Sequence, residues 1–149
     1  MRIREGSSSD HDALVDIWLR SVRATHTFLT EDDIQELLPL VRGGALAELE
    51  LWVLEDDGGT LAGFMGLEGA TVEALFIAPE FLRRGGGRML IDHARRLKGG
   101  PLRVDVNEQN PEAVRFYERC GFTVVGRSDV DSAGRPFPLL HMREGVHGG

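Results

Sequence analysis

The sequence predicts an α/β (α+β) fold in which helices pack on one mixed sheet, formed by a single domain over residues 1–149. Three observations predict it. Apolar residues recur at helical spacing in the N-terminal third, three extended apolar runs follow from Leu51, and extended and helical runs then alternate to the end. A chain of 149 residues is about one domain long and can bury its own core.

The N-terminal third is expected to hold a short strand and two helices. Residues 3–4 form the strand, and Ser9 caps the first helix, with Asp12 as the acidic residue of a capping box. The apolar stripe of that helix consists of Leu14, Ile17, Trp18, Ser21 and Val22. Thr30 caps the second helix, which is expected to end before Pro39.

After a further helical turn, expected over residues 41–49, the pattern becomes extended. Three strands are predicted over residues 51–55, 60–67 and 71–78. The residues Asp56-Asp57-Gly58-Gly59 between the first two strands are typical of a hairpin turn. These three strands therefore form a meander.

Glycine, proline and asparagine divide the C-terminal half into alternating elements. A helix follows the glycines at 85–87, and a strand covers residues 102–106. Asn110 caps the next helix, Pro111 occupies its first position, and Gly121 ends it. The last two strands are predicted over residues 122–126 and 137–142. The count is about seven strands and about four helices.

Composition and charge exclude several classes of protein. The net charge of −7 and pI of about 5.2 argue against a nucleic-acid partner, which normally requires a broad basic face. No apolar run approaches the ~18–20 residues of a membrane span, and residues 1–6 are too polar for a signal peptide. The single cysteine, Cys120, excludes an internal disulfide and indicates a reducing cytoplasm. No metal site is expected, because His11, His141 and His147 lack ligand spacing.

A glycine-rich loop follows the third strand of the meander. Between Pro79 and the helix stand Arg83, Arg84, Gly85, Gly86, Gly87 and Arg88. A strand, a glycine turn and a helix start together present free backbone N–H groups to an anion, and arginines add charge-assisted hydrogen bonds. The loop is neither a Walker A motif nor a dinucleotide fingerprint. A phosphate-bearing ligand is predicted; the alternative is a flexible loop with solvated arginines.

A second motif follows about twenty residues later. Asn-x-x-Ala-x-x-Phe-Tyr-x-x-x-Gly-Phe spans Asn110 to Phe122, and with the glycine loop it resembles the GNAT superfamily of acetyl-CoA-dependent N-acetyltransferases. Other segments resemble one branch, the YjaB-type acetyltransferases: residues 17–22, 24–26, 74–77, 106–110 and 138–140. The similarity covers nearly the whole chain.

The resemblance implies a fold and a cofactor site. The sheet is expected to be mostly antiparallel, with strands 72–77 and 102–106, the fourth and fifth, splayed to hold acetyl-CoA. The expected cofactor-binding residues are Leu75, Phe76, Ile77, Arg83, Arg84, Gly85, Gly86, Gly87, Arg88, Asn110, Ala113, Phe116 and Tyr117. The strand would bind the pantetheine arm through its backbone, and the loop would hold the pyrophosphate through its amides.

The loop departs from the family pattern at two positions. Leu82 stands where the family usually has a polar residue, and Arg83 stands where glycine is common. The amide cradle needs only backbone, so it survives both changes. Arg83 or Arg84 is expected to replace the polar contact, although Leu82 could also weaken cofactor binding.

Three residues are candidates for proton transfer. Tyr117 is expected to protonate the departing thiolate, since a phenol keeps its proton at neutral pH; the alternative is a core tyrosine bonded to a backbone acceptor. Glu73 lies on the strand over residues 72–77, where members of the family that this chain resembles often have an acidic residue, and it is a candidate base for the amine. The alternative is that Glu73 is simply an exposed residue of the strand. His26, between the first two helices, competes for the same role, and capping or packing is its alternative.

The expected reaction is direct transfer of acetyl from acetyl-CoA to a primary amine in a ternary complex, without a covalent enzyme intermediate. A small molecule or a peptide remains open as the acceptor, and a homodimer is compatible with the chain. Two alternatives are a non-catalytic acetyl-CoA or CoA-binding regulatory module and a nucleotide- or phosphate-binding protein.

Overall fold

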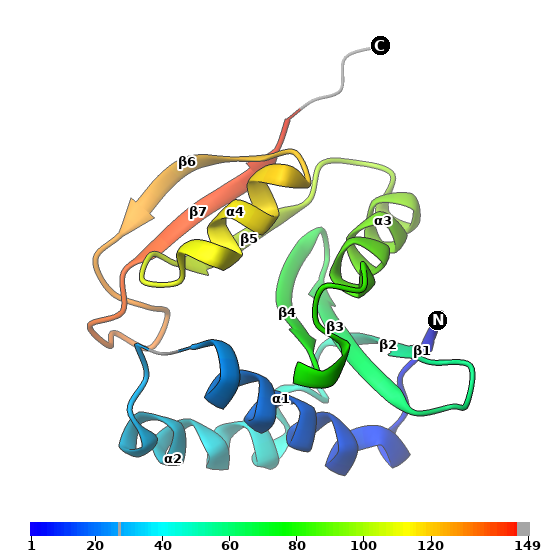
Figure 1. Ribbon diagram of the computed structural model, residues 1–149. Coiled ribbons are helices and arrows are strands. Elements are labelled where there is room, and N and C mark those ends of the chain that lie inside the picture. The colour runs from blue at the N-terminus through cyan, green and yellow to red at the C-terminus, as the bar shows by residue number, and fades with distance from the viewer. Residues whose placement is uncertain (27, 146–149) are drawn as a thin grey trace.

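The computed structural model describes residues 1–26 and 28–145, and these contain one seven-stranded sheet (Figure 1). Its strands are β1 (Arg2–Glu5), β2 (Glu50–Glu55), β3 (Leu61–Glu68), β4 (Thr71–Ile77), β5 (Arg103–Asn107), β6 (Phe122–Ser128) and β7 (Leu139–Glu144). The spatial order is β1-β2-β3-β4-β5-β7-β6, and every neighbouring pair is antiparallel except β4 and β5. The predicted mixed, mostly antiparallel sheet is confirmed.

Four α-helices pack on the sheet: α1 (His11–Thr25), α2 (Glu31–Leu40), α3 (Gly86–Lys98) and α4 (Pro111–Arg119). Short turns of helix complete the described elements: η1 (Ser8–Asp10), η2 (Val41–Ala45) and η3 (Pro79–Phe81). The further turn expected over residues 41–49 is thus a single π-helical turn that ends at Ala45.

Two expected helix boundaries are wrong. The first capping box is formed by Ser7 and Asp10, not by Ser9 and Asp12, because the short helix η1 precedes α1. The second helix includes Pro39 in its last turn and continues to Leu40. The cap at Thr30 is confirmed: its hydroxyl accepts the N–H of Asp33 at 3.1 Å, and the Asp33 carboxylate accepts the N–H of Thr30.

The sheet is covered differently in its two halves. Helices α1 and α3 both pack against β3 and β4, and every residue from Ala62 to Leu67 is buried. In the other half α4 packs against β5 and β6, lying in front of them in Figure 1. Along β5, Val104 and Val106 are buried while Arg103 and Asp105 are exposed. One face of this half is therefore open.

Strands β4 and β5 separate soon after they meet. They pair only at Thr71 with Arg103 and at Val72 with Val104. The pairing of β4 with β3 also skips Glu73, which makes this residue a β-bulge and bends the strand. The structure thus contains the expected splay, and its V opens between the remainder of β4 and β5.

No helix among residues 1–26 and 28–145 is long and apolar enough to cross a membrane.

Candidate active site

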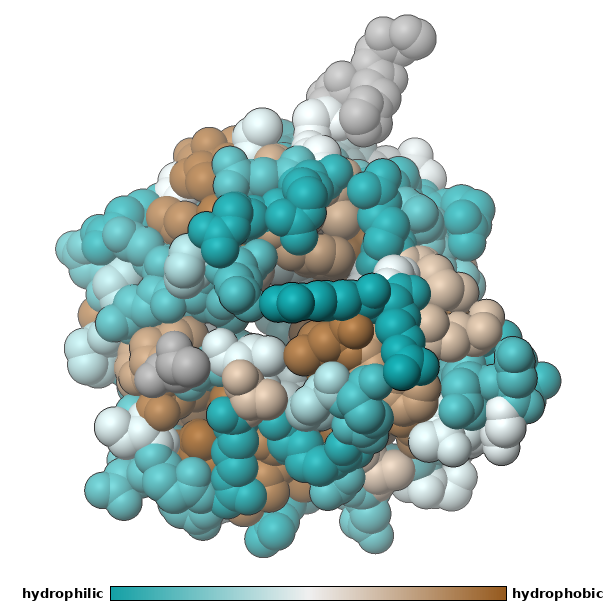
Figure 2. Space-filling view, in the orientation of Figure 1, coloured by the Kyte–Doolittle hydropathy of each residue, from teal (hydrophilic) through white to brown (hydrophobic). Residues whose placement is uncertain are grey.

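A cavity of about 150 Å³ lies where β4 and β5 separate. Its lining residues come from β4, β5, the start of α4 and the end of α1: His26, Val72, Glu73, Ala74, Leu75, Phe76, Val104, Asp105, Val106, Asn107, Asn110, Ala113 and Tyr117. The face in Figure 2 is hollowed near its centre, where brown apolar surface is bordered by hydrophilic side chains. All three predicted proton-transfer residues line this one cavity.

Tyr117 is fixed by packing on α4. Its side chain is 7% exposed, and its ring meets those of Phe116 and Phe122 edge-on at 5.1 and 5.4 Å between centroids. Burial raises the pKa of Tyr117 above its ordinary value, so the phenol holds its proton throughout the neutral range. The hydroxyl makes no hydrogen bond within the described part of the chain. The alternative interpretation of Tyr117, a core tyrosine, required a hydrogen bond to a backbone acceptor.

Glu73 projects from the bulge of β4 while Val72 and Ala74 are buried, as alternation along the strand predicts. The Glu73 side chain is exposed, as its alternative interpretation expected, yet it stands at the cavity. Partial desolvation there is the main cause that raises the pKa of Glu73, and the nearby carboxylates of Glu68 and Asp105 raise it further. A carboxylate with a raised pKa is a stronger base than an ordinary glutamate, which suits removal of a proton from an amine.

His26 ends α1 and turns its ring toward β4. The ring lies 5.4 Å from that of Phe28 and 6.1 Å from that of Phe76, and its Nδ1 lies 2.9 Å from Thr25 Oγ1. Burial lowers the pKa of His26, so the neutral imidazole is favoured. His26 therefore remains chemically able to accept a proton in the same cavity.

The predicted cofactor residues divide into two groups. Leu75, Phe76, Asn110, Ala113 and Tyr117 line the cavity, while Ile77, Phe116 and the glycine loop lie outside it. The Asn110 side chain accepts the N–H of Ala113 at 3.2 Å and so caps α4 as expected. This cap leaves the Asn110 backbone at the edge of the cavity.

Two glycines of the loop pack closely against side chains of this chain, which leaves no room for a side chain of their own. A Cβ on Gly86 would lie 2.6 Å from Leu54 Cδ2, and one on Gly87 would lie 3.0 Å from Phe116 Cζ. The bond from Met89 N–H to Gly85 O, at 3.0 Å, is the first of α3, so the N–H groups before it have no helical acceptor. These groups fit a diphosphate at the start of a helix.

The arginines of the loop differ in their surroundings. Arg83 has a positive φ of 64°, a conformation that favours glycine, at a position where the family commonly has glycine. The Arg84 guanidinium lies over the Phe81 ring, 5.5 Å from its centroid. Arg88 donates to the Arg119 carbonyl at 3.3 Å and lies 3.5 Å from Asp92. Leu82 is 41% exposed.

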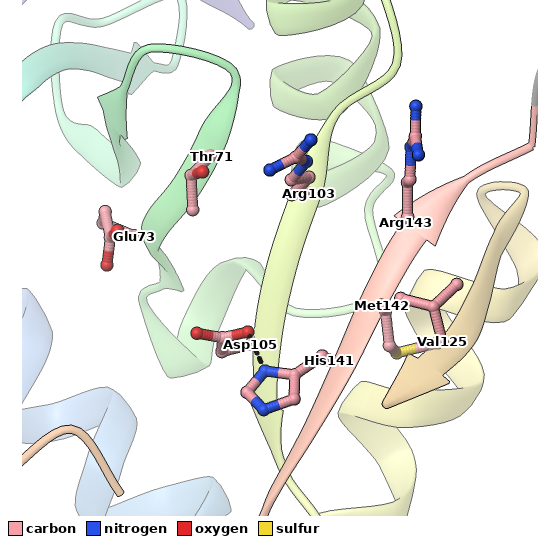
Figure 3. Close-up of a pocket in the computed structure, with 8 residues that line it drawn as sticks. All are labelled: Thr71, Glu73, Arg103, Asp105, Val125, His141, Met142 and Arg143. Atoms are coloured by element: carbon pink, nitrogen blue, oxygen red, sulfur yellow. Dashed lines mark hydrogen bonds and ion pairs between the residues drawn. The ribbon is translucent and has the colours of Figure 1, made fainter. Parts of the chain in front are cut away.

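A second and larger cavity, of about 440 Å³, lies on the open face of the sheet (Figure 3). Its lining residues are Thr71, Glu73, Arg103, Asp105, Val125, His141, Met142 and Arg143. Glu73 and Asp105 line both cavities, so they stand where the two meet.

Sequence reasoning missed Asp105 and His141 as candidate site residues. The alternation of Leu102, Val104 and Val106 could have indicated Asp105 as an outward residue beside Glu73.

The residues described by the structure contain no group of three or more histidine, cysteine, aspartate or glutamate side chains that could hold a metal ion. Cys120 is buried beneath α4, and burial raises the pKa of its thiol. His147 lies outside the described residues.

Comparisons with known proteins agree with this geometry. A model of the acetyltransferase (GNAT) domain matches residues 47–124. The peptidyl-lysine N-acetyltransferase YjaB of Salmonella typhimurium is 45% identical over 142 residues, which cover 95% of this chain and 97% of that protein. The solution structure of apo YjaB from Escherichia coli is 44% identical with a TM-score of 0.87, covering 95% of both chains.

A more distant structure shares the fold. The PaiA N-acetyltransferase of Thermoplasma acidophilum, solved in complex with coenzyme A, is 21% identical with a TM-score of 0.74 and covers 96% of this chain and 97% of its own. The predicted resemblance to this superfamily and to its YjaB-type branch is thus confirmed. The chain belongs to the GNAT family of acetyltransferases.

Proposed function

We propose that this enzyme transfers acetyl from acetyl-CoA to the side-chain amine of a lysine in a peptide or protein. One observation carries the proposal: a single cavity at the splay of β4 and β5 brings together a buried phenol, a carboxylate with a raised pKa and a neutral imidazole. The relatives named for peptidyl-lysine acetylation, at 45% identity, support the acceptor class.

Acetyl-CoA supplies the acetyl group as a thioester. The N–H groups at the start of α3 would hold its diphosphate. The backbones of Leu75, Phe76 and Ile77 on the splayed part of β4 would bind the pantetheine arm, with Asn110 and Ala113 on the other side of the cavity. Phe116, which lies against Gly87, would contact the cofactor nearer the loop. Arg83, Arg84 and Arg88 would add charge beside the phosphates.

Two proton transfers fall to the side chains in the cavity. Tyr117, kept protonated by burial, would donate its proton to the departing sulfur as a general acid. Glu73 would accept the proton of the acceptor ammonium, directly or through water, and the neutral His26 is the competing base. Direct attack then needs no covalent enzyme intermediate, and catalysis rests mainly on holding the two reactants together.

Release of free thiol from acetyl-CoA, measured across a panel of amines, tests the proposal. The panel contains a peptide with one lysine and a blocked N-terminus, the same peptide with a free N-terminus and no lysine, a polyamine, an amino sugar and free amino acids. We expect turnover with the lysine peptide. Binding of CoA without thiol release from any amine would favour a non-catalytic module instead.

A thermal-shift measurement distinguishes a CoA-binding protein from the remaining alternative, a nucleotide- or phosphate-binding protein. A ligand that binds only the native state raises its stability, so CoA should stabilise the protein while ATP and NAD should not. The reverse result would favour a nucleotide-binding protein. We further propose a cytoplasmic enzyme of one domain over residues 1–149. A homodimer stays a prediction, and light scattering measures it directly.

A further inference from the structure

The cavity on the open sheet face carries two rows of charge of opposite sign. In the pairing of β5 with β7, Asp105 lies opposite His141, and Arg103 lies opposite Arg143. The two rows are two residues apart along each strand, which is about 7 Å. On β4, Thr71 pairs with Arg103, and Glu73 lies just beyond the paired residues and lines the same cavity as Asp105 (Figure 3). The carboxylate row thus consists of Asp105 and Glu73, with His141 behind Asp105, and the arginine row consists of Arg103 and Arg143.

The carboxylate row is held in place by hydrogen bonds. His141 Nδ1–H donates to Asp105 Oδ1 at 2.6 Å, and His141 Nε2 lies 2.6 Å from Ser128 Oγ. This chain runs across β5, β7 and β6 and fixes the direction of the Asp105 carboxylate. Because Asp105 and Glu73 stand where the two cavities meet, a cation between them would lie next to the cavity that contains Tyr117.

The arginine row is unfavourable without a ligand. Like charges directly opposite each other on neighbouring strands destabilise a sheet, and Arg103 and Arg143 form such a pair. Neither side chain forms an ion pair with any residue in 1–26 or 28–145. An anionic group bound between them would remove the repulsion and use both guanidinium groups. This arrangement points to an anion beside the cationic end of the acceptor.

We propose that the acceptor enters through this cavity as a lysine with an acidic residue beside it in the sequence. The ammonium donates to Asp105 and Glu73, and the acidic side chain accepts from Arg103 and Arg143. Asp105 is a substrate-binding residue, while His141 and Ser128 act through it as positioning residues. The inference rests on the proposed function and specifies which lysines the enzyme acetylates.

A pair of peptides tests the arginine row. Both have blocked termini and one central lysine, flanked on each side by Glu in one peptide and by Gln in the other. We expect kcat/KM to be about five- to tenfold higher with Glu, which corresponds to the net contribution of one hydrogen bond of ordinary strength, because both arginines are exposed to water. In the double variant Arg103→Gln/Arg143→Gln the ratio should fall to about one. Arg96→Gln, an exposed arginine on α3, should keep the wild-type ratio.

Variants of Asp105 test the carboxylate row. Asp105→Asn should raise the KM for either peptide about tenfold while the KM for acetyl-CoA stays unchanged, and Asp105→Glu should restore part of the loss. His141→Ala should raise the peptide KM less. The double variant Asp105→Asn/His141→Ala should be no worse than Asp105→Asn, because His141 acts through Asp105. Asp129→Asn, an exposed acid outside the cavity, is the matched control.

The outcomes separate this inference from the proposed function. A wild-type enzyme that acetylates neither peptide contradicts the lysine acceptor itself. Equal kcat/KM for the two peptides, or a ratio that survives loss of both arginines, overturns the inference alone. Free lysine carries a side-chain ammonium and a carboxylate together with a third charge on its α-amine, so it is assayed beside the peptides. Preference for free lysine over the Glu peptide would also overturn the proposal, and additive effects of the Asp105 and His141 variants would reject the positioning role.

Discussion

At the scale of single residues, Tyr117 illustrates how a motif and its environment act together. The sequence places a tyrosine before a glycine-phenylalanine pair, which is equally compatible with a core position and with an acid. The structure surrounds its ring with Phe116 and Phe122 and leaves the hydroxyl without a partner among the described residues. A buried phenol beside the splay is therefore suited to donate a proton.

We expect Tyr117→Phe to lower kcat about a hundredfold or more, the usual effect of losing a general acid, without changing the KM for acetyl-CoA. The ring and its packing remain, so the free energy of unfolding should change little. Steady-state kinetics with saturating peptide measures kcat. An unchanged kcat would remove the acid role from Tyr117.

Glu73 gives the reaction a pH dependence with a definite sign. A base works only when it is deprotonated, so activity should rise with pH through the pKa of Glu73, which burial holds above the ordinary value of a glutamate. Glu73→Gln should lower kcat/KM for the peptide and remove this acidic limb of the profile. If the limb persists in Glu73→Gln and disappears in His26→Gln, the imidazole is the base.

At the scale of elements, the turn from η3 into α3 combines a favourable and an unfavourable feature. Gly85 has a φ of 81°, which glycine adopts without strain, but Arg83 has a φ of 64°, which costs a residue with a side chain about 1 kcal/mol or more. An arginine at a position that favours glycine fits the role proposed above, in which its charge lies beside the cofactor phosphates.

Replacement of Arg83 by glycine should therefore raise the free energy of unfolding by about 0.5–1 kcal/mol, because relief of the strain exceeds the added flexibility of the unfolded chain. Denaturation in urea measures the difference. Arg84→Gly, where φ is not positive, is the matched control and should lower stability. A destabilised Arg83→Gly variant would contradict the strain.

The elements also show where prediction from sequence stopped. Thr30, Asn110 and Pro111 carry local signals for helix ends, and the two helices begin where these signals indicate. The prediction of a cap at Ser9 was wrong because Ser7 offers the same hydroxyl group. The hydrogen bond from the Ser7 N–H to Asp10, which makes Ser7 the cap, is seen only in the folded structure. Pro39 does not end α2, which continues to Leu40. Its missing N–H costs one bond to the carbonyl four residues earlier, and the packing of the buried Ile34 and Leu38 outweighs that cost.

At the scale of the whole molecule, a network of charges joins one edge of the sheet to the start of the first helix. Arg4 donates to both oxygens of Asp10 at 2.9 Å and to Glu55 at 3.1 Å. Asp10 also accepts the N–H of Ser7 at 2.9 Å. Hydrogen bonding to Arg4 is the main cause that lowers the pKa of Asp10, to about 2. The network thus links β1, β2 and the start of α1.

This network predicts how acid acts on the fold. A folded-state pKa below the unfolded value of about 3.9 stabilises the protein above that pH, and the contribution is lost as pH falls toward 2. Asp10→Asn should lower the free energy of unfolding by about 1–2 kcal/mol at pH 7, and the gap to the wild type should close between pH 4 and about 2. Asp57→Asn, which removes a fully exposed acid outside the network, is the matched control variant.

The sequence alone determined the order of the elements and the family and predicted a cofactor loop, because periodicity, caps and the two motifs are local and each is contained in a short segment. The tertiary structure decided which residues share a cavity. Glu73, Asp105 and His141 come from three strands, and their meeting depends on the parallel contact of β4 with β5, the bulge at Glu73 and the antiparallel register of β7. Register between distant strands is set by packing over the whole sheet, so no local pattern contains it.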